Sequence, residues 1–163
     1  MVTSDEVGSL SQGRDKTGIK GTNTLFFIPY DDIPPDRRGH IKNDRTVCTV
    51  RPEKDNPNRT RITFAGSNMF SPIDCGTPTA SLITVELLFN SVISTPGAKF
   101  MGIDISNFYL NTPMERFEYM RMKLDSFPPD IVEQYNLKKI ANSKGYVHCE
   151  VRKGMYGLQP LAY

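Results

Sequence analysis

Two runs of alternating residues, separated by the turn-forming tetrapeptide DNPN, constrain the fold of this chain most. The first run, TVCTVRPEK, covers residues 46–54, and the second, RTRITFAG, covers residues 59–66. Alternation places successive side chains on opposite faces of an extended strand, and Asn, Asp and Pro favour a tight turn. We therefore expect a β-hairpin here, with charged residues at its base and polar residues at its tip.

A helix is expected after the hairpin, within the segment CGTPTASLITVELLFNSVIST (residues 75–95). Thr77 is placed to cap its N-terminus, and Pro78 suits the first helical position, where a missing backbone N–H leaves no bond unmade. Apolar side chains follow at helical spacing, at Leu82, Val85, Leu88 and Val92. The pattern ends at Pro96-Gly97. The spacing predicts a helix with one face for the core.

Further strands and a second, short helix are expected downstream. The segment AKFMGID (98–104) is short and apolar, as in a buried strand, so Asp104 would lie at or just past a strand end. FEYMRMKL (117–124) and GYVHCEV (145–151) alternate like strands, and PDIVEQYNLKKI (129–140) can form a short helix. A Gly-rich turn, RKGMYGL (152–158), follows the last strand.

Composition limits the classes of protein to which the chain can belong. It has 163 residues, 38% of them hydrophobic, which suits one domain with a core. No run of about 18 apolar residues occurs, so we expect neither a membrane span nor a membrane partner. Residues 1–24 are rich in Gly, Ser, Thr and charge and are expected to be a flexible lead-in, not a signal peptide. Three widely spaced cysteines argue against a disulfide scaffold or a zinc knuckle and favour a reducing, intracellular setting.

The basic residues are concentrated in one segment. Although the net charge is only +2, residues 37–61 hold eight basic and three acidic side chains. Such a segment could contact phosphate groups while the rest of the chain stays near neutrality. The alternative is a solvated, charged hairpin, which is the interpretation that charge alone favours.

Asp104 is the acidic residue that most needs an explanation. Burying a carboxylate costs several kcal/mol unless it is paired, hydrogen-bonded or bound to a cation. An acid at a strand end beside a basic hairpin suits Mg²⁺, which prefers one or two carboxylates together with substrate phosphates. Alternatively, the Asp104 side chain caps the turn DISN (104–107), a common use of Asp.

Two long phrases carry a family resemblance. KFMGIDISNFYLNTPMERFEYMRM, from residue 99, and VRKGMYGLQP, from residue 151, resemble the reverse transcriptase domain of copia-type retrotransposon polyproteins. The likeness runs from about residue 45 to residue 160. It implies an α+β fold in which residues 25–163 form a fingers hairpin and the first part of a palm, with an antiparallel sheet and packed helices. The implied reaction adds deoxynucleoside triphosphates to a primer 3′-end on an RNA or DNA template, and releases pyrophosphate.

The resemblance implies a role for several residues around the acid. Asp104 matches the first catalytic aspartate, a ligand of both Mg²⁺ ions, and the backbone carbonyl of Ile105 matches the adjacent ligand. Tyr109 matches the aromatic residue under the sugar of the incoming nucleotide, where its ring would exclude a 2′-hydroxyl. Without the resemblance, Tyr109 could be an ordinary core aromatic.

Three basic residues of the hairpin match the cations with which the family holds the triphosphate. They are Arg61 and, as further candidates, Lys54 and Arg59. Arginine suits this task because its planar fork grips phosphate oxygens in pairs. Arg61 could instead pair with Glu53 or Asp55 across the hairpin.

The last motif differs from the family pattern. The family shows Pro and then Gln after YGL, with the Gln near the incoming nucleotide, whereas this chain has Gln159 followed by Pro160. Tyr156 and Gly157 are expected to form a turn and not to touch substrate. His148 and Cys149 fall on opposite faces of a strand, so we expect structural roles and no shared metal for them.

The acidic pair that completes the family's metal site is missing from this sequence. The family carries a Tyr-x-Asp-Asp hairpin beyond YGL, and no adjacent Asp pair follows Asp104 here. Two-metal phosphoryl transfer needs more carboxylates than one. The chain alone is therefore expected to polymerise nothing, although the intact family uses a template-primer, deoxynucleotides and the rest of the polyprotein, in cytoplasmic particles or the nucleus. The alternatives are a non-catalytic nucleic-acid-binding module and a decayed remnant that does not fold.

Overall fold

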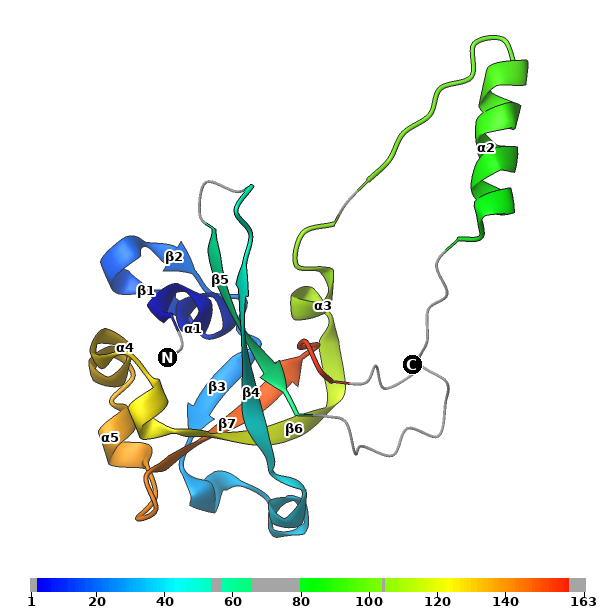
Figure 1. The fold of residues 1–163 in the computed structure, drawn as a ribbon. Coiled ribbons are helices and arrows are strands. Elements are labelled where there is room, and N and C mark those ends of the chain that lie inside the picture. Colours follow the sequence, from blue (N-terminus) through cyan, green and yellow to red (C-terminus); the bar gives the residue numbers. More distant parts are fainter. Residues whose placement is uncertain (1–2, 54–56, 66–79, 104, 159–163) are drawn as a thin grey trace.

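The computed structural model describes residues 3–53, 57–65, 80–103 and 105–158 (Figure 1). Its centre is a five-stranded sheet with the strand order β3-β7-β6-β4-β5. All neighbouring strands are antiparallel except β4 and β6, which pair in parallel over two residues of each strand. The strands are β3 (Leu25–Ile28), β4 (Lys42–Val50), β5 (Asn58–Phe64), β6 (Pro113–Lys123) and β7 (Tyr146–Lys153). A small second sheet pairs β1 (Gly13–Arg14) with β2 (Ile19–Lys20).

Short helical segments surround this sheet. The α-helices are α1 (Ser4–Leu10), α2 (Leu82–Ser94), α3 (Phe108–Asn111), α4 (Pro129–Gln134) and α5 (Leu137–Ile140). The 3₁₀ turns are η1 (Asp15–Thr17), η2 (Tyr30–Asp32), η3 (Pro35–His40) and η4 (Leu124–Ser126). In Figure 1, α1, α4 and α5 lie together at one side of the sheet, whereas α2 stands away from the body.

One face of the sheet forms the core. In β7, Val147, Cys149 and Val151 alternate with more polar neighbours and are fully buried. Met120 and Met122 of β6 lie beside them, and the same cluster includes residues of α1, α4 and α5. Burying a side chain of this size contributes roughly 1.5–3 kcal/mol, so this single face supplies most of the apolar stabilisation. The fold is α+β with a mainly antiparallel sheet, as predicted.

Alternation predicted the strands well. The expected hairpin is present as β4 and β5, which pair in antiparallel register from Asp44–Phe64 to Val50–Asn58. The two later alternating runs are β6 and β7. The segment 129–140 forms two short helices instead of one, because Asn136 between them adopts a left-handed conformation with φ of 52°.

The flexible lead-in predicted for residues 1–24 was wrong for the described part of that segment. Helix α1 is capped by Thr3, whose side chain accepts from the Glu6 amide, and it buries Val7 and Leu10 in the core. Backbone bonds from Thr22 to Ser9 and from Thr24 to Leu10 fasten the following residues to the helix. Two apolar residues are enough to anchor one face of this short helix on the core. Because the segment has no long apolar run, its composition did not predict a helix.

The buried strand predicted at 98–104 was also wrong. Residues 98–103 form no strand, and Phe100, Met101 and Ile103 are 52%, 76% and 74% exposed. An apolar run makes a strand only where another strand is positioned to accept its hydrogen bonds, and composition does not report that.

Helix α2 confirms the expected helix but not its burial. It begins after Ser81, whose hydroxyl accepts from the Thr84 amide, while Thr77 and Pro78 lie outside the described residues. None of its residues is buried, so the apolar face predicted for the core is uncovered. Within the described residues, no helix combines the length and apolar character needed to cross a membrane.

Candidate functional site

A pocket of about 660 Å³ brings together three segments that are far apart in the sequence. It lies between strand β5, the segment 105–108 and the turn that follows β7. Its lining residues are Arg59, Arg61, Ile105, Ser106, Asn107, Phe108 and Tyr156. Among the described residues, two arginines and no carboxylate line it, which makes it a candidate site for an anionic ligand.

The strand register points both arginines in one direction. Arg59 and Arg61 are two residues apart on β5, so their side chains share a face. Ile62 and Phe64 point the other way and are 1% and 2% exposed. Because burial of these two side chains fixes the orientation of the strand, the arginines are held on the pocket side.

Arg61 is stacked on an aromatic ring. Its guanidinium carbon lies 4.4 Å from the centroid of the Tyr156 ring. Its Nε is buried and has no hydrogen-bond partner among the described residues. Because that atom is shielded from solvent, the positive charge of the guanidinium, and not this donor, is available to a ligand in the pocket. The geometry favours an oxygen-rich anion beside Arg61.

Tyr156 and Gly157 form a turn, as the sequence predicted, and this turn positions the Tyr156 ring. The Phe64 amide donates to the Tyr156 carbonyl over 2.7 Å, which fastens the turn to the end of β5. Gly157 has φ of 87°, and a Cβ there would lie 2.1 Å from the Phe64 carbonyl oxygen. Only glycine allows this approach. Tyr156 was not predicted to face a site, because a turn motif does not reveal what its aromatic residue contacts.

The segment 105–108 enters helix α3, which is anchored to the body. The buried Leu110 carbonyl of α3 accepts from the Thr24 hydroxyl over 3.0 Å. Asn107 has φ of 56° and its carbonyl accepts from the Asn111 amide, so the chain turns sharply into the helix. Asn tolerates this left-handed conformation, which is the one sequence signal that could have identified Asn107 as a lining residue.

An acid on the far side of β5 contributes to the electrostatics. The Glu6 carboxylate of α1 accepts from the Ile62 amide over 3.1 Å. Burial raises the pKa of Glu6, and the hydrogen bond from Ile62 and the charges of Arg59 and Arg61 partly oppose this rise. Glu6 therefore balances part of the positive charge of the strand without lining the pocket.

The structure brings together three of the predicted site residues. Arg59, Arg61 and Ile105 all line the pocket. Tyr109 belongs to α3 and directly follows the lining residue Phe108. Its side chain is not among the parts of the chain that the structure describes. Asp104, Lys54 and Gln159 also lie outside the described residues. Ser106 and Phe108 were not predicted, because neither residue type marks a site at that spacing.

The pair His148 and Cys149 occupies structural positions. Both residues are buried, and they lie on opposite faces of β7. The centroid of the His148 ring lies 5.1 Å from that of Tyr30, and burial lowers the pKa of His148.

Within the described ranges, no group of three or more His, Cys, Asp or Glu residues is arranged to hold a metal ion. Mg²⁺ at Asp104 and Ile105 stays a prediction from the resemblance, because Asp104 lies outside the described residues.

Comparison with known proteins identifies no relative of this chain. No family model matches the sequence, and neither a curated protein nor a solved structure does.

Proposed function

We propose that this chain is the fingers and the first part of the palm of a copia-type reverse transcriptase, and that the pocket receives the triphosphate of a deoxynucleotide. One observation carries the proposal. The hairpin, the segment after Asp104 and the YGL turn are the regions of the resemblance, and all three contribute to a single pocket. The meeting of these three regions in one pocket supports the proposal.

The pocket suits a nucleotide in size and chemistry. Its volume of about 660 Å³ lies within the usual range for small-molecule sites, roughly 300–1,000 Å³. The forks of Arg59 and Arg61 can grip phosphate oxygens in pairs. Ile105 and Phe108 offer apolar surface for the sugar, beside the position that the resemblance gives to Tyr109.

The proposed activity of the chain alone is nucleotide binding without polymerisation. The resemblance gives Asp104 one place in a two-metal site, and the adjacent acidic pair that would complete it is missing after Asp104 in this sequence. A second chain that supplies those acids would be needed before a primer could be extended.

Binding of a fluorescent deoxynucleoside triphosphate tests the proposal. We expect Arg61→Gln to weaken binding about tenfold or more, since a charge-assisted bond contributes roughly 1.5–3 kcal/mol. Arg45→Gln is the matched control, because Arg45 lies on the same hairpin but does not line the pocket. The wild-type chain should also prefer the triphosphate to the monophosphate. Equal affinities of the two variants would contradict the assignment of the pocket.

The role of Asp104 requires an activity measurement. In a longer chain that carries the acidic pair, Asp104→Asn should abolish primer extension with Mg²⁺, whereas Asp125→Asn on η4 should leave it unchanged. Equal rates for Asp104→Asn and the unmodified chain would remove Asp104 from the metal site.

A further inference from the structure

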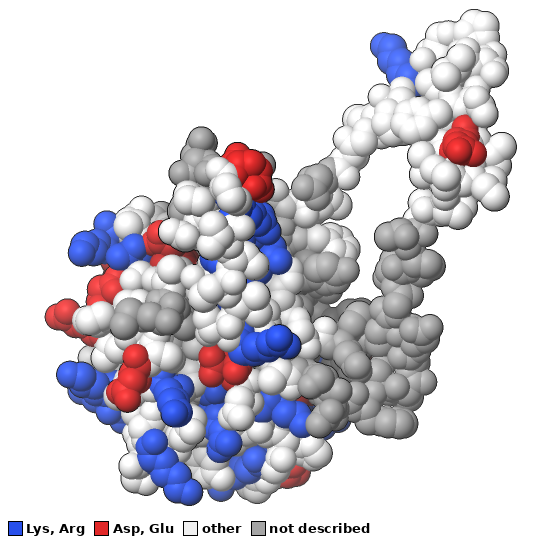
Figure 2. Space-filling model, viewed as in Figure 1, with Lys and Arg blue, Asp and Glu red and all other residues white. Residues whose placement is uncertain are grey.

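Charges of both signs are mixed over the surface around the sheet. On the face shown in Figure 2, Lys and Arg are interspersed with Asp and Glu there, whereas α2 carries little charge. The net charge of the whole chain is only +2. Such a surface does not by itself attract anions or cations strongly. A site for a small charged molecule therefore has to be formed locally, by a cavity and the side chains that reach into it.

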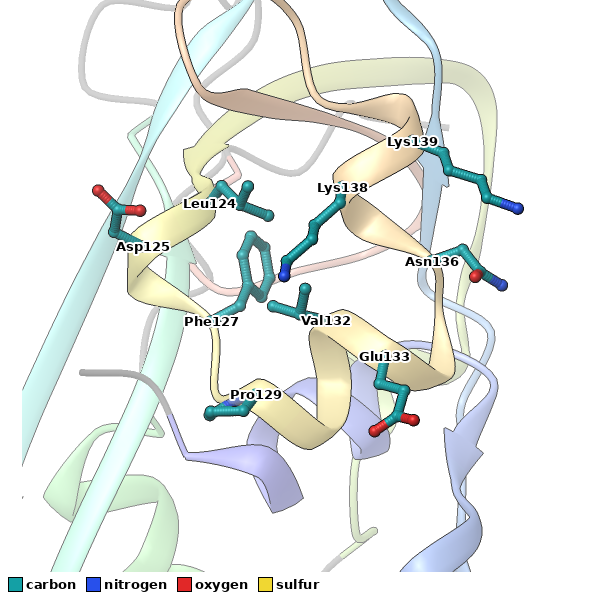
Figure 3. Close-up of a pocket in the computed structure, with 9 residues that line it drawn as sticks. All are labelled: Leu124, Asp125, Phe127, Pro129, Val132, Glu133, Asn136, Lys138 and Lys139. Carbon is teal, nitrogen blue, oxygen red and sulfur yellow. The ribbon is translucent and has the colours of Figure 1, made fainter.

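A second pocket meets this requirement. It lies against η4, α4 and α5, and the residues that line it are labelled in Figure 3. None of them lines the pocket that contains Arg59 and Arg61. Its volume of about 680 Å³ lies within the usual range for small-molecule sites, roughly 300–1,000 Å³. The pocket is therefore large enough for a small organic ligand.

The walls of this second pocket are anchored in the core. Ile131 of α4 and Leu137 of α5 are both 0% exposed. Between the two helices, Asn136 has φ of 52°, so the chain turns sharply from one wall into the next. The Asp130 carboxylate of α4 also accepts from the Ser4 hydroxyl over 2.8 Å, which ties the helix to α1. A ligand would thus meet a site that is already formed, and little ordering would oppose its binding.

The floor of the second pocket is apolar. Leu124, Phe127 and Val132 line it, and we call these three residues the apolar floor. Phe127 belongs to the core cluster, and the other two pack against that cluster. The Phe127 ring is held edge-on to the Phe27 ring, with centroids 5.7 Å apart. A ligand that covers this floor needs an apolar part, because removing apolar surface from water is what stabilises such a contact.

One charged side chain reaches over the apolar floor. In Figure 3, Lys138 extends toward Phe127 and Val132, whereas Lys139 points away from them. The Asp125 and Glu133 carboxylates also point outward, on two different sides of the pocket. Among the described residues, Lys138 forms no ion pair. The charge that a ligand on the floor would meet is therefore a single ammonium group.

We propose that the second pocket binds a small carboxylate with a hydrocarbon tail. The carboxylate pairs with the Lys138 ammonium group, and the tail lies on the apolar floor. A neutral ligand would leave the ammonium group unpaired beside apolar surface, and a cationic ligand would be repelled by it. This inference goes beyond the proposed function, because the two pockets share no lining residue.

The neighbouring acids favour a carboxylate over a phosphate. A phosphate group carries close to two negative charges at pH 7. Lys138 can neutralise one of them, and Asp125 and Glu133 at the edge of the pocket oppose the other. A carboxylate carries one charge, which matches the single ammonium group.

Titration of the chain, with labelled Val and Leu methyl groups, by octanoate tests the proposal in NMR spectra. We expect the Val132 methyl signals to shift and to saturate. 1-Octanol has the same tail without a charge and should bind about fivefold more weakly, as for a partly exposed ion pair, and octylammonium should bind more weakly still. The Leu87 methyl signals, on the exposed helix α2, report any unspecific uptake by apolar surface and should not saturate with them.

Two matched variants isolate the role of Lys138. Lys138→Gln should weaken octanoate binding about fivefold and leave 1-octanol binding unchanged. Lys139→Gln removes the same charge from the next residue, whose side chain points away, and should change octanoate binding less than about twofold. Val132→Thr places a hydroxyl on the apolar floor at nearly the same shape and should weaken both ligands alike. Thermal melting checks that each variant folds.

The outcomes that would overturn the inference are specific. They are equal affinities for octanoate and 1-octanol, equal losses in Lys138→Gln and Lys139→Gln, and shifts of Leu87 at the same concentrations as those of Val132. Absence of any saturable shift at Val132 would overturn it as well. Deoxynucleotide binding should survive Lys138→Gln and fail in Arg61→Gln, so the two pockets are tested separately.

Discussion

Gly157 is a single residue on which the geometry of the candidate site depends. Because a Cβ there would lie 2.1 Å from the Phe64 carbonyl oxygen and φ is 87°, Gly157→Ala cannot be accommodated without moving backbone. We expect a loss of about 2–4 kcal/mol in the free energy of unfolding, measured by urea denaturation. Gly39→Ala is the control, since a Cβ there meets no atom within 4 Å and should change stability by less than about 0.5 kcal/mol. Equal denaturation midpoints for the two variants would show that the turn does not pack on β5.

Asp130 makes a pH-dependent contribution through a second local network. The Ser4 hydroxyl donates to its carboxylate over 2.8 Å, Arg14 pairs with it over 2.8 Å, and these partners hold its pKa below the ordinary value of 3.8. The carboxylate thus stays charged in the folded chain at pH values where the unfolded chain already binds a proton. Its contribution is present above about pH 4 and is lost as the pH falls through its lowered pKa.

Thermal melting of Asp130→Asn against the wild-type chain measures this contribution. The variant should melt at a lower temperature at pH 7, and the difference should shrink at pH 2–3. Asp125→Asn, an exposed site on the nearby η4, removes the same charge and should show no such convergence. A difference for Asp130→Asn that is constant with pH would mean that ionisation of this carboxylate plays no part.

The packing of β7 predicts that the thiols of Cys149 and Cys48 react at different rates. Cys149 lies on its core face and is fully buried, and burial raises the pKa of its thiol, whereas Cys48 on β4 is exposed. In a Cys75→Ser background, we expect Cys48 to react quickly with a disulfide reagent and Cys149 to react only after urea unfolds the chain. Two thiols that react quickly without urea would show that β7 is not packed as described.

Elements could be predicted from the sequence where burial is one-sided. Strands β5, β6 and β7 alternate because one face packs on the core, so their period identifies them without a partner. The apolar segment 98–103 has no such signature, and its exposure depends on the rest of the fold. Helix α1 was missed because its apolar residues Val7 and Leu10 are few and lie among charged and small neighbours.

The candidate site could be predicted only in part, for a related reason. Arg59 and Arg61 were predicted because the resemblance places them on the hairpin, and the strand register shows that their side chains share a face. The contact between Arg61 and Tyr156 joins residues 95 positions apart, and local pattern carries no information about such a pair.

The whole molecule combines a packed body with an uncovered apolar helix. The body is the five-stranded sheet with its core cluster, and the uncovered helix is α2, which we call the arm. On α2, Leu82, Leu87 and Ile93 are 72%, 64% and 81% exposed, and no α2 residue belongs to the core cluster. A helix of 13 residues is marginal in water without packing. Large apolar side chains exposed together on one helix favour association in water. The body, by contrast, has a continuous core and should melt cooperatively in circular dichroism, which a remnant that does not fold would fail to do.

This contrast predicts that the arm governs association while the body governs stability. Leu87→Ser/Ile93→Ser should reduce concentration-dependent self-association in light scattering and dye binding to apolar surface, yet leave the melting temperature within about 2 °C, because neither side chain is buried. Leu25→Ser, at a core position that is 2% exposed, should do the reverse: it should lower the melting temperature by about 10 °C or more, since a polar group would replace buried apolar surface. If the arm variant melted as early as the core variant, α2 would have to pack on the body, and the arm would not be free to drive association.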